Sequence, residues 1–320
     1  MMKISVIVPC YNEQEVLRET CRRIKDVLAS NGLTDHEMLF VNDGSTDGTP
    51  LLLREFAERD RAVKVIHFSR NFGHEAATAA GIQHCSGDIA FLLDADLQDP
   101  PELIPEMIAL WRKEKSNVVY GVRKSREGET FLKKLTSKLF YRFFNAISDV
   151  PFPIDTGDFR LIDHKVIAEF KRLGERKMYV RGLLTWVGFK QIPFFYERQK
   201  RFAGTTKYNY RKLLRLSFDI IFSFTKRPLK LALELGAASV IISLLLLLYA
   251  FVSRFIAPLP GWASTIIIII FFGGVQLLTI GVIGEYIAII FDEVKRRPQY
   301  IIDELMNLDA PVDKDRSNRR

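Results

Sequence analysis

The chain has 320 residues, of which 48% are hydrophobic and 26% charged, and its formal net charge is +8. This length allows one large domain or two modest domains, and a charged fraction near one quarter argues against a simple disordered chain. Charged residues are absent from 236–252 and from 255–284. Each of these stretches can cross a ~30 Å hydrocarbon layer, which argues against a purely soluble protein.

Residues 1–125 alternate between strand-like and helix-like patterns. Short apolar runs occur at 4–8, 38–41, 63–66, 89–93 and 118–122, and helix-patterned segments such as 15–29 and 101–113 separate them. Near-continuous apolar strands with crossover helices are typical of a parallel sheet that is covered on both faces. Ligands of open α/β sheets bind beyond the carboxyl ends of the strands, so we expect the site at that edge.

Two carboxylates, Asp94 and Asp96, emerge where the fourth predicted strand ends. Mg²⁺ typically takes one or two protein carboxylates and fills its shell with phosphate oxygens and water, and a departing nucleoside diphosphate needs such a cation. An isolated Asp-x-Asp pair is more often a turn or a solvated face. The position at a strand end, followed by Pro101 at a helix start, favours a metal site.

Asp43 ends the second predicted strand. A carboxylate there can accept hydrogen bonds from a nucleotide base or a ribose hydroxyl. The alternative is turn chemistry that caps a helix beginning near Asp47, and both interpretations can hold together. The exit of the first strand, 9–13, could flank the base in the same way, with Tyr11 packing against it.

Two later stretches, 131–147 and 211–224, mix basic and apolar residues at helical spacing. The pattern favours helices that lie in the membrane surface, although an ordinary half-buried helix has the same pattern. Basic residues also bracket the apolar stretches, namely Lys226, Arg227 and Lys230 before them and Lys295, Arg296 and Arg297 after them. The positive-inside rule therefore predicts that both ends are cytoplasmic, with a short external loop near 258–261. Anionic lipids explain this basicity better than nucleic acid does, so no nucleic-acid partner is expected.

Three segments together resemble inverting glycosyltransferase family 2: VPCYNE at 8–13, NDGSTD at 42–47 and DADLQDPPE at 94–102. More narrowly, they are similar to its polyprenyl-phosphate branch, which includes dolichol-phosphate mannose synthases and bactoprenol glucosyltransferases. The likeness runs from Lys3 to about Tyr300 and includes the terminal apolar hairpin. These motifs are highly specific for the family and the branch, and much less specific for the sugar.

The resemblance implies a GT-A fold, Mg²⁺ or Mn²⁺, and transfer of a sugar from a nucleotide donor to a lipid phosphate. The residues implied to contact the donor are Pro9, Tyr11, Glu13, Asp43, Asp94, Ala95 and Gln98, and those implied for the metal are Asp94, Asp96 and Gln98. The segment RFAGTTK at 201–207 is similar to the family's R-x-x-G-x-S-K element, which implies that Arg201 and Lys207 contact donor or acceptor phosphates, and both are included among the expected donor-binding residues.

The acceptor side of the site is also implied by the resemblance. Arg123 matches an acceptor-phosphate arginine, and the weaker candidates are Arg126, Lys133 and Ser137. An acidic residue within 155–160 is expected near the acceptor; Asp158 matches best and Asp155 second, so the catalytic candidates are Asp158, Asp155 and Asp96. The alternative is that 155–160 is merely a loop that caps a helix starting near Asp163. Whether Asp158 is a base or a positioning group stays open.

The expected fold class is α/β: a GT-A, Rossmann-like domain with a mostly parallel sheet, interfacial amphipathic helices and a C-terminal two-helix transmembrane hairpin. The expected parts are a cytoplasmic catalytic domain at 1–210 (donor half 1–125, acceptor half 126–210), an interfacial helix at 211–228, two transmembrane helices at 229–292 and a cytoplasmic segment with a disordered end at 293–320. This organisation predicts a multi-pass protein of the inner (plasma) membrane. Small residues in the spans, including Gly236, Gly273, Gly274, Gly281 and Gly284, permit close helix packing for hairpin closure or for a homo-oligomer.

The favoured reaction is inverting transfer of glucose from UDP-glucose to undecaprenyl phosphate, because the chain resembles bactoprenol glucosyltransferases most closely. The alternative reaction is transfer of mannose from GDP-mannose. A polysaccharide synthase is disfavoured because two spans can hardly enclose a polymer channel and no Q-x-x-R-W segment occurs. A non-catalytic membrane scaffold is the third alternative, and the intact acidic and basic motifs argue against it. The expected partners are the nucleotide sugar, the polyprenyl phosphate and membrane lipids.

Overall fold

The computed structural model describes residues 2–123, 156–175, 179–199, 222, 225–256 and 262–308. They belong to two compact units. The sheet unit comprises Met1–Leu139, Pro151–Lys207 and Pro298–Arg320, and the helical unit comprises Phe140–Val150 and Tyr208–Arg297.

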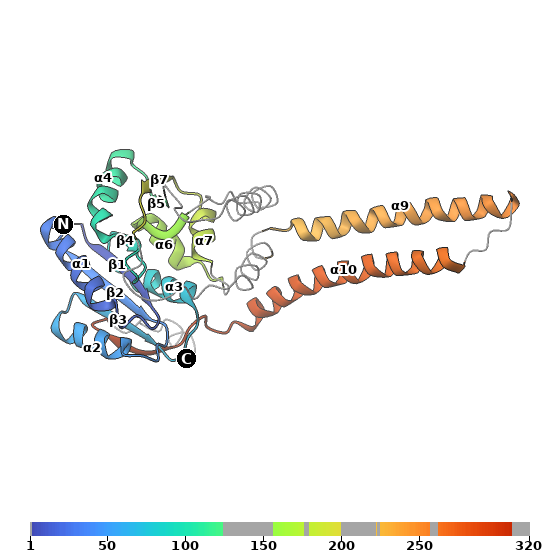
Figure 1. Cartoon of the computed structure of the whole chain (residues 1–320). Helices are drawn as coiled ribbons and strands as arrows, with labels where there is room; N and C mark the ends of the chain where they lie inside the picture. Colours follow the sequence, from blue (N-terminus) through green and yellow to red (C-terminus); the bar gives the residue numbers. More distant parts are fainter. Residues whose placement is uncertain are drawn as a thin grey trace, which may run out of the picture. The chain divides into compact units, whose positions relative to one another are not determined.

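Within the described part of the sheet unit, eight strands form one sheet in the order β7-β5-β6-β4-β1-β2-β3-β8. Their bounds are β1 Ile4–Cys10, β2 His36–Asn42, β3 Val63–Phe68, β4 Ile89–Leu92, β5 Val118–Arg123, β6 Thr156–Asp163, β7 Gln191–Tyr196 and β8 Ile302–Met306. The neighbours β4, β1, β2 and β3 are parallel, as are β5 and β7, whereas β6 and β8 run antiparallel to the strands beside them. The expected α/β class with a mostly parallel sheet is confirmed (Figure 1).

Helices cover both faces of this sheet. Their bounds are α1 Leu17–Ser30, α2 Thr49–Arg59, α3 His74–His84, the 3₁₀ helix η1 Pro101–Leu103, α4 Ile104–Glu114, α6 His164–Arg172 and α7 Val180–Trp186. Buried side chains of α1, α2 and α4 share one core cluster with alternate residues of β1. On the opposite face α3 lies so close to β1 that a Cβ at Gly81 would be 2.2 Å from Cγ2 of Ile7. Every residue of β1 is buried, as a central parallel strand requires.

Strand β6 is a feature that the sequence analysis did not identify. The alternative that 155–160 is merely a loop before a helix is wrong, because Thr156–Asp163 is a strand inserted between β4 and β5. The helix start is confirmed, because Oδ1 of Asp163 accepts hydrogen bonds from the backbone N–H groups of Lys165 and Val166 at 3.1 Å each. The strand has charged side chains alternating with apolar ones, and this hides it in a search for apolar runs.

Strand β8 is also new relative to the sequence analysis, which expected only a cytoplasmic segment at 293–320. It pairs with β3 at the edge of the sheet. Nδ2 of Asn307 donates hydrogen bonds to the carbonyls of Ala57 and Val63 at 2.7 and 2.8 Å. The ring of Tyr300 stacks on that of Phe68 with centroids 4.8 Å apart. Part of the C-terminal segment is therefore built into the sheet unit.

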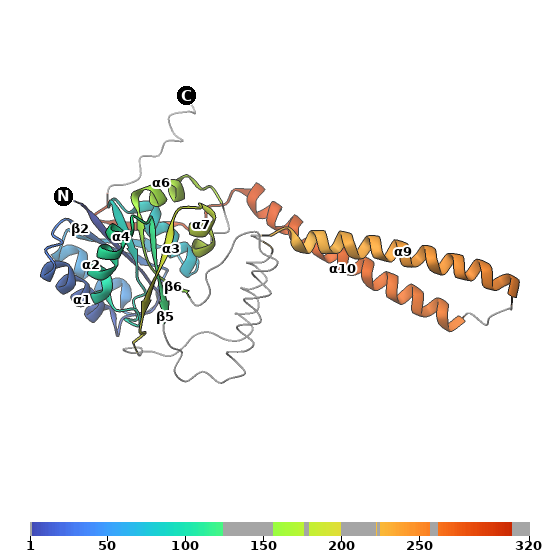
Figure 2. The ribbon, with the colours of Figure 1, turned by 90° about the horizontal axis from the view of Figure 1, so that it is seen from above.

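The helical unit contains two long helices, α9 Arg227–Ile256 and α10 Trp262–Lys295, which lie side by side in both views (Figures 1 and 2). The hydroxyl of Tyr286 donates to the carbonyl of Thr225 at 2.8 Å. The segments Arg227–Tyr249 and Ile268–Lys295 are long and apolar enough to cross a membrane, and in an 18-residue apolar window of each only 6% and 0% of the residues are buried. A core helix of a soluble protein would be mostly buried, so these helices leave an apolar surface that needs a non-aqueous neighbour.

One of the two roles expected for the glycines of these helices is contradicted. A Cβ added at Gly236, Gly273, Gly274, Gly281 or Gly284 would meet no described atom within 4 Å. These glycines therefore do not serve close packing between α9 and α10, and their role in a homo-oligomer stays a prediction. The expected amphipathic helix at 131–147, most of 211–224, the external loop at 258–261 and the expected disordered end from 309 lie outside the described residues.

Candidate active site

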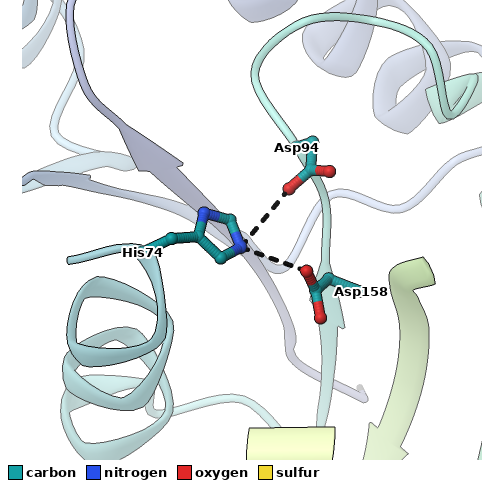
Figure 3. A group of neighbouring side chains, drawn as sticks. All are labelled: His74, Asp94 and Asp158. Atoms are coloured by element: carbon teal, nitrogen blue, oxygen red, sulfur yellow. Dashed lines mark hydrogen bonds and ion pairs between the residues drawn. The ribbon is translucent and has the colours of Figure 1, made fainter. Parts of the chain in front are cut away.

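Two acidic side chains meet at the carboxyl end of β4 because the neighbouring strand β6 runs antiparallel to it. Leu92 of β4 is opposite Arg160 of β6. Asp94 lies two residues after Leu92, and Asp158 lies two residues before Arg160, so both carboxylates reach the edge where β4 ends. His74, the first residue of α3, points between them (Figure 3). Its Nε2 is 3.2 Å from Oδ2 of Asp158 and 3.7 Å from Oδ1 of Asp94.

Asp158 is held from a second side by Arg181 of α7. Nε of Arg181 donates to Oδ1 at 2.6 Å, and a terminal nitrogen donates to Oδ2 at 2.9 Å. Burial alone would raise the pKa of Asp158, but the charge and hydrogen bonds of Arg181, together with His74, hold it well below its ordinary value. Both oxygens are engaged by cations, so this carboxylate is a poor acceptor for a further proton.

The neighbouring groups have strongly shifted pKa values. Burial alone would lower the pKa of His74, but its hydrogen bond to Asp158 and the charge of Asp94 raise it to about 10. Burial raises the pKa of Asp94 to about 6; His74 opposes this shift, and nearby carboxylates, Asp158 first among them, add to it. Burial, with a further contribution from Asp158, raises the pKa of Glu75 to about 7, and this side chain accepts a hydrogen bond from the backbone N–H of Val180 at 2.8 Å. The acidic groups at the carboxyl end of β4 therefore carry more negative charge than the neighbouring cations, His74 and Arg181, neutralise.

The residues expected to hold a metal begin in a tight turn after β4. Oδ1 of Asp96 accepts a hydrogen bond from the backbone N–H of Gln98 at 3.1 Å, and Leu97 between them has a left-handed φ of 58°. Among the described residues, potential ligand atoms of His74, Asp94 and Asp158 lie within 4.8 Å of one another. Crowded carboxylate oxygens suit a hard divalent cation such as Mg²⁺ or Mn²⁺, so the site fits the expected metal. The ligand set Asp94, Asp96 and Gln98 stays a prediction.

Asp43 lies buried at the end of β2. Its Oδ1 accepts a hydrogen bond from the backbone N–H of Phe72 at 2.6 Å, and its Oδ2 accepts one from Gly73 at 2.9 Å. These bonds fix the loop that delivers His74. The alternative that the Asp43 turn caps α2 is wrong for Asp43, because its carboxylate bonds this other loop and the N-cap of α2 is Gly48, without a side-chain cap hydrogen bond. Oδ1 of Asp47 accepts from the backbone N–H of Thr49 at 3.0 Å. A nucleotide contact at Asp43 stays a prediction.

The exit of β1 is tied to the exit of β2. The backbone N–H of Asn12 donates to Oγ of Ser45 at 2.9 Å, and Oδ1 of Asn12 accepts from the backbone N–H of Thr46 at 2.8 Å. The backbone N–H of Glu13 donates to Oγ1 of Thr49 at 2.8 Å. These bonds hold the expected donor-contact loop rigidly, with Pro9 buried in β1, Ala95 buried beyond β4 and the ring of Tyr11 37% exposed.

The remaining predicted residues divide by position. Arg123 ends β5 beside Gly157 of β6, where a Cβ on that glycine would be 2.9 Å from a terminal nitrogen of Arg123. The other predicted residues lie outside the described part of the chain: Asp155, Arg126, Lys133, Ser137, Arg201 and Lys207.

Sequence reasoning missed His74 and Arg181. A signal for His74 was present, because it follows the end of the third predicted strand at the start of a helix. Arg181 had no such signal, since its place beside Asp158 depends on β6 and α7, neither of which the apolar pattern revealed.

Comparison with known proteins identifies relatives along nearly the whole chain. The model of glycosyl transferase family 2 matches residues 5–170. An uncharacterized glycosyltransferase of Bacillus subtilis, YkcC, is 48% identical over 308 residues, which is 95% of this chain and 94% of that protein. The SfII prophage-derived bactoprenol glucosyl transferase of Shigella flexneri is 39% identical over 306 residues, 94% of this chain and 97% of that protein. Among solved structures, glucosyl-3-phosphoglycerate synthase from Mycobacterium tuberculosis in complex with Mn²⁺ and UDP-glucose is similar with a TM-score of 0.45 and 20% identity, over 69% of this chain and 77% of that one.

Proposed function

The chain belongs to glycosyltransferase family 2, and from this membership we propose that it transfers glucose from UDP-glucose to undecaprenyl phosphate, with inversion at the anomeric carbon. The reaction takes place at the cytoplasmic face of the inner membrane. Its product is a polyprenyl phosphate glucose.

One observation carries this proposal. The similarity to proteins named bactoprenol glucosyl transferase spans 94% of this chain at 39% identity, so it includes the sheet unit and both long helices. A relative that shared only a nucleotide-sugar domain would stop before the helical unit. The match of both parts supports a lipid-linked acceptor as well as a sugar nucleotide.

The helical unit supports the choice of a membrane-bound acceptor. Moving a polyprenyl chain out of the bilayer costs about 0.8 kcal/mol for each exposed CH₂ group, so the acceptor stays in the membrane and presents only its phosphate. We propose that α9 and α10 anchor the enzyme there, with both termini cytoplasmic. Basic residues at the start of α9 and at the end of α10, such as Arg227 and Lys295, support this orientation.

The geometry around Asp158 supports an acceptor that needs no strong base. Attack by a sugar hydroxyl would require a group to take its proton, but both oxygens of Asp158 are engaged by Arg181 and His74. A phosphate monoester is mostly dianionic at neutral pH, because its second pKa is about 6. We therefore assign Asp158 to orienting the reactants. Asp155 is the second candidate for this role.

The charge of the two reacting groups must be balanced by the protein. At the donor, a Mg²⁺ or Mn²⁺ held by Asp94 and Asp96 with Gln98 would neutralise the nucleoside diphosphate as it departs. At the acceptor, we propose that Arg123, Arg126, Lys133 and Ser137 bind the attacking phosphate, and that Arg201 and Lys207 bind donor or acceptor phosphates. Holding two anions in line is the main contribution of such a site.

The rest of the donor occupies the exits of β1 and β2. We propose that Pro9, Tyr11, Glu13 and Asp43 bind the nucleotide and that Ala95 lies against it. The hydrogen bonds that tie these two loops together keep this surface preorganised.

A donor panel tests the proposal. The full-length protein, purified in detergent, is incubated with undecaprenyl phosphate, Mg²⁺ and one radiolabelled donor at a time: UDP-glucose, UDP-galactose or GDP-mannose. We expect chloroform-soluble label from UDP-glucose that disappears on chelation of the metal. Label in the lipid from GDP-mannose alone would show that the donor is GDP-mannose and not UDP-glucose. Water-soluble polymer would indicate a polysaccharide synthase. The absence of metal-dependent transfer from every donor would overturn the proposal.

A further inference from the structure

A second buried ionic cluster lies beyond the metal loop, on the opposite face of β6 from Asp158. Its centre is Asp99, which is 0% exposed. The hydroxyl of Tyr196, at the end of β7, donates a hydrogen bond to Oδ1 of Asp99. The same oxygen is 3.7 Å from Nε of Arg198. Thus Asp99 fixes the end of β7 and the two residues that follow it.

Arg123 approaches the same carboxylate from β5. The Cβ position of Gly157 lies 2.9 Å from a terminal nitrogen of Arg123 and 3.8 Å from Oδ2 of Asp99, so both groups lie over this glycine, and the charge of Arg123 acts on the carboxylate. Any side chain at 157 would occupy part of this space. Gly157 therefore leaves room for Arg123 to reach the cluster.

The cluster has an excess of unsatisfied polar groups. The charges of Arg123 and Arg198 both act on the carboxylate of Asp99, and so does the nearby carboxylate of Asp96. Three buried atoms make no hydrogen bond with the described residues: Oδ2 of Asp99, Nε of Arg123 and Nε of Arg198. The side chain of Arg198 is still 28% exposed, so the cluster is open to solvent on one side. Buried polar atoms that lack partners are costly and mark a place where a ligand is expected.

Resting on the proposed function, we propose that Asp99 is a positioning residue that sets Arg123 and Arg198 as a pair, and that this pair binds the phosphate monoester of the acceptor. A dianionic phosphate matches two guanidiniums, each of which can give it two parallel N–H bonds. Asp99 separates the two like charges while the acceptor is absent, and Tyr196 holds the carboxylate in place. Arg198 becomes a further acceptor-binding residue.

Kinetics of three variants test this assignment in the full-length protein. Asp99→Asn keeps the shape and removes the charge, and Arg198→Gln removes one member of the pair. Gly157→Ala introduces a Cβ that displaces the flexible end of Arg123 without a clash against the backbone. The matched control is Gly174→Ala, where a Cβ would meet nothing described within 4 Å.

We expect the KM for undecaprenyl phosphate to rise about tenfold or more in Asp99→Asn and Arg198→Gln and about threefold in Gly157→Ala, for the loss or displacement of a charge-assisted contact. The KM for UDP-glucose and the melting temperature of Gly157→Ala should match those of Gly174→Ala. An unchanged acceptor KM in Arg198→Gln, or equal increases in both KM values, would overturn the proposal. Should Asp99→Asn fail to fold, the other two variants still decide.

A binding measurement separates this proposal from the proposed function. Farnesyl phosphate is titrated into the wild-type protein and Arg198→Gln in the absence of any donor. Weaker binding by the variant supports the arginine pair even if the wild-type protein transfers no glucose. Equal binding of farnesyl phosphate by both proteins, or no binding by the wild-type protein, would contradict the proposal that Arg123 and Arg198 bind the acceptor phosphate.

Discussion

The two ends of the central strands both carry carboxylates withdrawn from solvent, fully at Glu37 and partly at Asp94, but in opposite electrostatic settings. At the amino end, Glu37 of β2 accepts hydrogen bonds from the hydroxyl of Ser5 and from the N–H and hydroxyl of Ser86, each at 2.6 Å. Nζ of Lys64 lies 2.7 Å from it. Burial alone would raise the pKa of Glu37, but these partners lower it to about 2.

At the carboxyl end the balance is reversed. Burial and neighbouring carboxylates raise the pKa of Asp94 to about 6, although the charged His74 lies 3.7 Å away. The fully paired acid at one end stabilises the fold, whereas the crowded acids at the other end leave charge for a ligand to neutralise. The incomplete pairing of Asp94 is consistent with the metal role proposed for it.

The largest expected effect comes from Asp96→Asn. The amide oxygen can still accept the hydrogen bond from Gln98, so the turn is kept and only the charge is lost. We expect glucose transfer to fall by about 10³-fold, as for the loss of a group that stabilises developing charge, with an unchanged melting temperature. The control is Glu102→Gln in the same motif, whose carboxylate pairs with Arg23 at the surface. A near-wild-type rate for Asp96→Asn would contradict the metal assignment.

Glu37→Gln should have the opposite outcome, with stability lost and activity kept. Because the folded-state pKa lies below the ordinary value of 4.5, the ionised group stabilises the fold above pH 4.5, and this contribution is lost as the pH falls toward 2. We expect roughly 3 kcal/mol lower free energy of unfolding at neutral pH, and a difference from wild type that shrinks in acid.

Denaturant unfolding in detergent at pH 7 and pH 3 checks the prediction for Glu37. Glu19→Gln, which breaks an exposed ion pair with Arg22, serves as the control and should leave the unfolding midpoint unchanged. The prediction is wrong if the two variants behave alike, or if the difference between Glu37→Gln and wild type is as large at pH 3 as at pH 7.

A smaller effect is expected for Arg181→Lys. Lysine keeps the positive charge beside Asp158 but cannot supply the two parallel hydrogen bonds at 2.6 and 2.9 Å. We expect kcat to fall about tenfold with little change in donor KM, as for a residue that orients another. Arg172→Lys, at an exposed pair with Glu169, is the control. An unchanged kcat would remove Arg181 from the site.

Asn307→Ala should have the smallest effect, confined to the edge of the sheet unit. It removes the bonds to the carbonyls of Ala57 and Val63 and places alanine at a left-handed φ of 57°. We expect the free energy of unfolding to fall by about 1–2 kcal/mol. Faster amide hydrogen exchange in β3 and β8 would confirm that Asn307 secures this edge, and unchanged exchange would contradict it.

Local apolar patterns account for what the sequence predicted correctly. The runs at 4–8, 38–41, 63–66, 89–93 and 118–122 are strands β1 to β5, and the patterned segments 15–29 and 101–113 are helical. A central strand that is buried on both faces consists of a continuous apolar run, so it can be predicted without knowing which strands pair with it. The carboxylates at their ends follow from the same pattern.

The unpredicted parts depend on pairing between distant segments. Strand β6 carries Asp158 and Arg160 among its apolar residues, and it is recognisable as a strand only between β4 and β5. The contacts of Asp158 with His74 and Arg181 therefore could not be predicted from the sequence and are seen only in the structure. Strand β8 likewise exists because the chain returns to β3 after α10. Long-range pairing leaves no period in the local sequence.

The linkage in the product tests the central claim most directly. Lipid product made from UDP-α-glucose and undecaprenyl phosphate is extracted, and the anomeric proton and phosphorus couplings are measured by NMR. We predict a β-glucosyl phosphodiester, as displacement by the lipid phosphate from the face opposite the leaving diphosphate requires. An α-linked product, or glucose attached anywhere other than the lipid phosphate, would contradict the account.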